Sequence, residues 1–170
     1  MNEIYSAECL EQSVILIGIL LIVPLHAAEH EAVIWDVVFT RKIPQWMVLL
    51  IRMITAIVML VFLTGIFAEI MIVKNCTFPY MRYVVGTVIS ELALGSVGFF
   101  AAVLSNSVIV GYLVSIGYFL FNYLGNISDT NIFCLFSMRT GDFITKVWLF
   151  GISVLMITNS LIYVKKKKVC

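Results

Sequence analysis

The fold is decided by one apolar stretch, WMVLLIRMITAIVMLVFLTGIFAEIMIV at residues 46–73. Only Arg52 and Glu69 in it carry a charge. A helix that crosses a bilayer needs about 20 mostly apolar residues, so this stretch is long enough to span the membrane with some tilt. In the whole 170-residue chain 62% of residues are hydrophobic and 12% are charged, whereas a soluble domain is nearer half apolar and a quarter charged. The sequence therefore predicts an integral membrane protein.

Four further apolar segments accompany this stretch. They lie at residues 10–27, 83–104, 108–124 and 144–164. The first is short and contains Pro24, which removes a backbone donor and predicts a kink or an early stop. Only SNS, at residues 105–107, separates the second and third of them, which predicts a tight helical hairpin. We expect an all-α fold, a polytopic transmembrane helical bundle of about five spans that forms a single transmembrane domain over residues 1–170.

The distribution of basic residues predicts how the chain crosses the membrane, because lysine and arginine collect in cytoplasmic loops. No basic residue precedes the first span, whereas Arg41 and Lys42 lie in the next loop and four lysines at 165–168 follow the last span. We expect a multi-pass protein of the bacterial plasma membrane with its N-terminus outside and its C-terminus in the cytoplasm. The loop at 28–45 is then cytoplasmic, and the extracytoplasmic loop at 125–143 either lies on the membrane surface or dips into it.

The stretch PLHAAEHE at residues 24–31 places His26, Glu29 and His30 in the order of an inverted zinc-protease signature. A helix would carry both histidines on one side, and Glu29 would serve as a base. A zinc hydrolase also needs a third protein ligand, and no acidic residue within the spans lies in a recognisable third-ligand motif. We therefore predict no metal site, with polar side chains at the lipid–water boundary instead. A membrane-embedded metal-dependent hydrolase stays an alternative.

The first cytoplasmic loop reads AAEHEAVIWDVVFTRKIPQW and is amphipathic. On a helix of period 3.6, Val33, Ile34, Val37 and Val38 fall on one stripe, and the charged residues lie mostly off it. Pro44 marks a stop before the next span. Such a helix either lies in the lipid interface or docks its apolar face into a groove on a partner protein.

The order of these segments resembles the permease subunits of ATP-binding-cassette transporters in the second export-permease family (ABC type 2). An apolar span is followed by AEHEA, by an amphipathic stretch ending FTRKIPQW, and by a long span opening MVLLIRMITAIV. The later stretch GFFAAVLSNSVIVGYLVSIGYFLFN, with its Ser/Asn turn, also resembles that family. The resemblance implies that residues 28–45 form a coupling helix that contacts a separate ATPase. The implied contact residues are Glu29, Glu31, Trp35, Asp36 and Arg41, and Arg52 matches the basic residue that commonly opens the following helix.

The resemblance implies a subunit that forms part of the substrate pathway of an exporter and is not itself an enzyme. No Walker motif is present, so ATP is expected on the partner ATPase and no cofactor on this chain. The family usually has six spans with a cytoplasmic N-terminus, so we expect its first span to be missing here. A homodimer or a second membrane subunit, with surrounding lipid, completes the expected partners; nothing supports nucleic-acid binding. A non-catalytic membrane assembly or immunity protein is the other alternative.

Two polar residues inside the spans stand out, Arg52 and Glu91. A charge at membrane depth is costly unless it is paired. Glu91 either lines a substrate path or a subunit interface, or serves as a structural partner for Arg52 or for backbone groups. The small residues around it, among them Gly86, Gly95 and Gly98, predict close helix packing within the bundle or across a dimer, with Gly111 and Gly117 facing them.

Overall fold

The computed structural model confirms the all-α helical bundle. It describes residues 12–25, 45–73, 79–125, 134–137 and 143–167, and in these residues there is no strand. The helices are α2 (Ile15–Ile22), α4 (Gln45–Val73), α5 (Tyr80–Ser105), α6 (Val108–Leu124) and α7 (Phe143–Lys167). Each of the last four covers one of the predicted spans.

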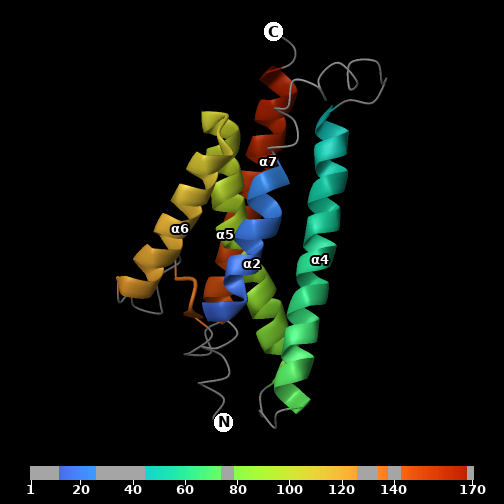
Figure 1. Cartoon of the computed structure of the whole chain (residues 1–170), viewed down its shortest axis with the longest axis vertical. Coiled ribbons are helices and arrows are strands. Elements are labelled where there is room, and N and C mark those ends of the chain that lie inside the picture. The colour runs from blue at the N-terminus through green and yellow to red at the C-terminus, as the bar shows by residue number, and fades with distance from the viewer. Residues whose placement is uncertain (1–11, 26–44, 74–78, 126–133, 138–142, 168–170) are drawn as a thin grey trace.

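The helices run alternately up and down, so that α2, α5 and α7 point one way and α4 and α6 the other (Figure 1). The start of α2 and the end of α7 therefore lie at opposite ends of the bundle. Three helices are long and apolar enough to cross a membrane, at Trp46–Val73, Tyr80–Ser105 and Ile144–Lys166, and two shorter apolar helices lie at Ile15–Leu25 and Val108–Leu124. These lengths and compositions support a multi-pass membrane protein.

The first described helix, α2, ends before its apolar segment does, as Pro24 predicted. The α-helix ends at Ile22 and the chain continues as a tighter 3-10 turn over residues 23–25. Proline at position 24 cannot donate the backbone hydrogen bond that would extend the α-helix. The predicted start of this span at residue 10 lies outside the described residues.

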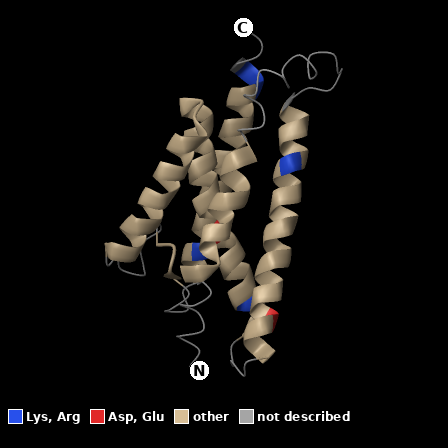
Figure 2. Ribbon diagram, viewed as in Figure 1, with Lys and Arg blue, Asp and Glu red and all other residues tan. Residues whose placement is uncertain are grey.

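The outer faces of the bundle are apolar, as expected of surfaces in contact with lipid. On α4 the exposed side chains include Ile51, Val58 and Phe62, and on α7 they include Ile144, Trp148 and Leu155. Figure 2 shows that the charged residues of the described helices are few and scattered on an otherwise uncharged ribbon. An apolar outside of this extent would be an aggregation hazard in water and is typical of a protein dissolved in a bilayer.

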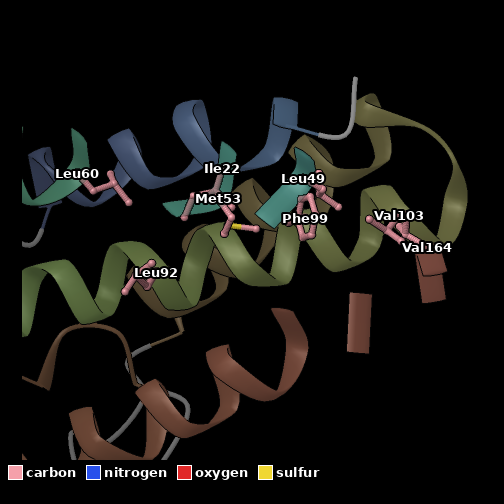
Figure 3. Packing of buried hydrophobic residues seen from close by; sticks show 8 residues of the cluster. All are labelled: Ile22, Leu49, Met53, Leu60, Leu92, Phe99, Val103 and Val164. Atoms are coloured by element: carbon pink, nitrogen blue, oxygen red, sulfur yellow. The ribbon is translucent and has the colours of Figure 1, made fainter. Parts of the chain in front are cut away.

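Helix α5 is the centre of the bundle. Within its most apolar stretch 72% of residues are buried, against 28% in α4 and 22% in α7, and it packs against each of the other four helices. One core cluster joins α2, α4, α5 and the end of α7 (Figure 3). Its buried members are Ile22, Leu49, Met53, Leu60, Leu92, Phe99, Val103 and Val164.

The small residues of α5 are used for packing within the chain. A side-chain carbon added at Gly95 would lie 2.6 Å from Ile22 Cδ1 and 2.9 Å from the Gly18 carbonyl oxygen of α2. One added at Gly98 would lie 2.9 Å from the Gly111 carbonyl oxygen of α6. Only glycine lets these backbones approach so closely. Gly117, by contrast, has nothing within 4 Å of the position that a side chain would take, so it does not face α5.

The turn between α5 and α6 is as tight as SNS predicted. Helix α5 ends at Ser105 and α6 begins at Val108. Asn106 terminates α5 in the left-handed region, with φ 53°. Asparagine is one of the few residues that adopts this conformation at a helix end at small cost.

Candidate functional site

The first polar group of the membrane interior is Glu91, which is fully buried on α5. It lies about 16 Å along the helix from Tyr80, well inside the bundle. Thr64 of α4 is its neighbour: Thr64 Oγ1 is 2.9 Å from Glu91 Oε1 and 3.1 Å from Oε2. Gly18 of α2 packs on the backbone carbonyl of Glu91 itself. Three helices therefore meet at this residue, α4 at its carboxyl group and α2 at its backbone.

The hydrogens at this contact favour a neutral carboxyl group. Thr64 Oγ1 also lies 2.8 Å from the carbonyl oxygen of Leu60, the usual acceptor for a threonine within a helix. A hydroxyl has one hydrogen, so it cannot be given to Leu60 and to Glu91 at once. If Glu91 carries a hydrogen, it donates to Thr64 while Thr64 donates to Leu60, and each hydrogen at the contact has an acceptor. A neutral carboxyl group also avoids the cost of an unpaired charge in the membrane interior.

The second polar group is Lys146, which is fully buried near the start of α7. Its Nζ donates to Ser90 Oγ of α5 and to the Leu135 carbonyl oxygen, each at 2.5 Å. Ser90 Oγ in turn lies 3.1 Å from the Gly86 carbonyl oxygen and 3.2 Å from that of Leu135. An ammonium group near a helix N-terminus is disfavoured by the helix dipole, so these acceptors offset a real cost.

The segment at residues 134–137 enters the bundle and is held there by side chains. Leu135 is fully buried and joins a core cluster with Leu94 and Leu149. Its backbone N–H donates to Asn122 Oδ1 of α6 at 3.0 Å, and its carbonyl oxygen accepts from Lys146 and Ser90. Irregular backbone inside a membrane protein needs such partners, because lipid offers none. These four residues therefore pack inside the bundle rather than on its outside.

The two polar groups share one element. Ser90 and Glu91 are adjacent on α5, and successive helix residues point about 100° apart, so Ser90 meets α7 while Glu91 meets α4. The arrangement ties α4, α5, α6, α7 and the segment at 134–137 together through polar contacts in an apolar interior. Such contacts are directional, so a shift of one helix must break or exchange them.

Arg52 lies away from this site. It is on α4 about 18 Å along the helix from Thr64, so it does not pair with the Glu91 carboxyl group. Its Nη1 is buried and has no hydrogen-bond partner among the residues that the structure describes. At the same end of the bundle Lys165 Nζ lies 5.9 Å from the centre of the Trp46 ring, which joins the end of α7 to the start of α4.

The predicted coupling residues Glu29, Glu31, Trp35, Asp36 and Arg41 lie outside the described residues, as do His26 and His30 of the metal alternative. Among the residues that are described, no group of three histidine, cysteine, aspartate or glutamate side chains is placed to hold a metal ion. The structure thus brings together Glu91 and its neighbours but not the remaining predicted positions.

Sequence reasoning did not assign Thr64, Ser90, Asn122, Leu135 or Lys146 to a site. For Lys146 a signal was present, because a lysine inside an apolar helix needs buried acceptors. Thr64 and Asn122 carry no such signal, because a single polar residue in a span is common.

Comparisons of the chain with models of protein families, with curated proteins and with solved structures found no match. The resemblance to ABC type 2 permeases therefore stays a prediction from the order of segments in the sequence.

Removing the Lys146 ammonium group is expected to loosen the segment at 134–137. Hydrogen bonds to charged groups contribute about 1.5–3 kcal/mol each, so Lys146→Ala should raise the open fraction of the segment about tenfold or more. Cys134, which is buried in this segment, reports the opening. A water-soluble maleimide applied to the protein in nanodiscs should label Cys134 faster, as measured by peptide mass spectrometry.

Lys165→Ala is the matched control, because Lys165 is exposed near the other end of α7. Its labelling rate at Cys134 should equal that of the unmodified protein. If Lys146→Ala leaves the rate unchanged, the ammonium group does not hold the segment.

Proposed function

We propose that this chain is a membrane-spanning permease subunit of an ATP-driven exporter, forming part of the substrate pathway and coupling to a separate ATPase. The observation that carries the proposal is the polar interior of an otherwise apolar bundle. Glu91 and Lys146 are both fully buried, and each contacts polar groups of another helix. Buried ionisable residues in membrane helices are costly and mark pathways or moving interfaces more often than simple anchors.

The position of α4 supports a coupling role. It follows directly on the loop at 28–45, and its 29 residues form one continuous helix along the side of the bundle (Figure 1). It is also much less buried than α5, so fewer contacts oppose its movement. Closure of the ATPase would push the coupling helix, and α4 would pass that displacement to α5 through the Thr64–Glu91 contact.

The orientation follows from the charges. Lys165 and Lys166 close α7 at the end of the bundle where α4 begins, and this end is the cytoplasmic one under the positive-inside rule. The proposed location is the bacterial plasma membrane, with the N-terminus outside and the C-terminus in the cytoplasm. ATP is bound by the partner ATPase, and a second copy of this chain or another membrane subunit completes the pathway.

Affinity purification tests the proposal. The tagged chain is extracted gently from its native membrane, and its partners are identified by mass spectrometry. We expect an ATPase subunit in stoichiometric amount, lost when residues 31–40 are replaced by a Gly/Ser linker of equal length. Replacement of residues 126–133, in the predicted outer loop, is the control and should leave the ATPase bound. Substitution of Trp35 or Asp36 should uncouple ATP use from transport.

A preparation in which no ATPase copurifies would remove this proposal. Zinc measured in that same sample would then separate the two alternatives. Stoichiometric zinc would favour the hydrolase, with His26, Glu29 and His30 as its site. Its absence would favour the assembly or immunity protein.

A further inference from the structure

A cavity of about 220 Å³ lies between α5, α6 and α7. Its lining residues are Ala93, Ser96 and Val97 of α5, Tyr118 of α6, and Leu149, Ile152, Ser153 and Met156 of α7. These residues lie near the middle of α5 and α7, so the cavity is at the depth of the lipid tails. It is separate from the Thr64–Glu91 contact, which lies between α5 and α4.

The walls of the cavity are apolar, and its two serines add no hydrogen-bond donor to them. Ser96 Oγ donates to the Ala93 carbonyl oxygen at 2.9 Å, and Ser153 Oγ donates to that of Phe150 at 2.8 Å. Each serine therefore gives its one hydrogen to its own helix and has none for a ligand. An apolar cavity of about 150 Å³ already stays dry and holds a benzene molecule, so water is a poor occupant for this larger one.

The segment at 134–137 packs beside one end of the cavity. Leu135 packs in the same cluster as Ala93 and Leu149, which line the cavity. Ser90 and Lys146 hold the carbonyl oxygen of Leu135. These two residues lie about one helical turn from Ala93 and Leu149, toward the start of α7. The polar contacts around Leu135 thus lie next to this end of the cavity and outside its lining.

We propose that this cavity is a binding site for the alkyl chain of a membrane-soluble amphiphile. The volume, the depth in the bundle and the apolar walls all select an alkyl chain over a polar or charged group. Residues from three helices contact the chain, so it is held by protein on several sides rather than by one lipid-facing surface. The proposal does not require a partner ATPase and stands or falls independently of the export function.

Photolabelling of the full-length protein in phosphatidylcholine nanodiscs tests it. The probe is a palmitic acid analogue with a diazirine at mid-chain. We expect saturable labelling of the peptides that contain Val97, Ile152 and Met156, reduced by excess unlabelled palmitate. Ser153→Leu should fill the cavity and remove most of that labelling. Val154→Leu is the matched control, because Val154 is exposed on the same helix and its enlargement leaves the cavity unchanged.

Ser96→Val fills the cavity from α5 and provides a second variant if Ser153→Leu does not fold, as judged by size-exclusion chromatography and circular dichroism. Labelling that spreads over exposed residues such as Leu155 and Phe150, and that excess palmitate does not reduce, would overturn the proposal. Labelling of the cavity residues that folded cavity-filling variants leave unchanged would overturn it equally.

Discussion

Replacing Gly98 with valine is expected to separate α5 from α6 and to lower the free energy of unfolding by about 3 kcal/mol or more. A side-chain carbon at this position would overlap Ser115 Oγ, lie 2.7 Å from Val23 Cγ2, and lie 2.9 Å from the Gly111 carbonyl oxygen. Ser115 can rotate, but the backbone of α6 cannot yield without moving the helix. Thermal unfolding in mild detergent, followed by circular dichroism, measures the loss.

Gly117→Val is the control for this variant. Gly117 is also inside a helix, but nothing lies within 4 Å of the added carbon. Valine has a higher helix propensity than glycine, so both substitutions stabilise their helix by the same few tenths of a kcal/mol. The difference between the two variants therefore isolates the close approach of α5 and α6. Equal stabilities would show that these helices are not packed glycine to glycine.

Replacing Glu91 with alanine is expected to cost about 3 kcal/mol, because it leaves a cavity where three helices meet and takes away the partner of Thr64. For a chain of this length that loss lowers the melting temperature by about 10 °C. Glu91→Gln should stay within about 1 kcal/mol of the unmodified protein, because its amide N–H can donate to Thr64 Oγ1 as the neutral carboxyl group does.

The pair of variants separates two roles of the side chain. If Glu91→Gln is as unstable as Glu91→Ala, the native group is an ionised carboxylate, and the neutral carboxyl group argued from the hydrogens at Thr64 is wrong. If Glu91→Gln is stable but no longer supports transport, the carboxyl group acts in the pathway. Thr64→Val completes a double-mutant cycle, in which the coupling to Glu91 measures the contact itself.

Most of the fold could be predicted from the sequence. Hydropathy alone places α4 and α6, because a long apolar run has no stable alternative to a helix in lipid. Pro24 and the SNS turn act locally, so their effects on the end of α2 and on the hairpin were also predictable. The lateral arrangement was not, because which helix lies at the centre depends on packing between residues far apart in the sequence.

The candidate site was predictable only in part. Glu91 could be singled out because burying a carboxyl group deep in a span costs free energy at any position of the helix in the bundle. Its partner could not, because the rotation of α4 about its own axis decides whether Thr64 or another residue meets it. Lys146 was harder still, since one of its acceptors is the backbone of Leu135, and a carbonyl oxygen has no signature in sequence. One interpretation of the sequence paired Arg52 with Glu91. That pairing is wrong, because Arg52 lies about 18 Å along α4 from Thr64, the residue that contacts Glu91.

The central position of α5 has a consequence for biosynthesis. The described apolar helix at Ile15–Leu25 is shorter than the stretch of about 20 residues that spans a bilayer, so it depends on its neighbours more than α4 does. Its buried residues Gly18 and Ile22 pack against α5, which the ribosome makes only after α4. Helix α2 can therefore complete its packing only after α5 has been synthesised. The packing of the described helices is thus completed around α5, and not in the order of the chain.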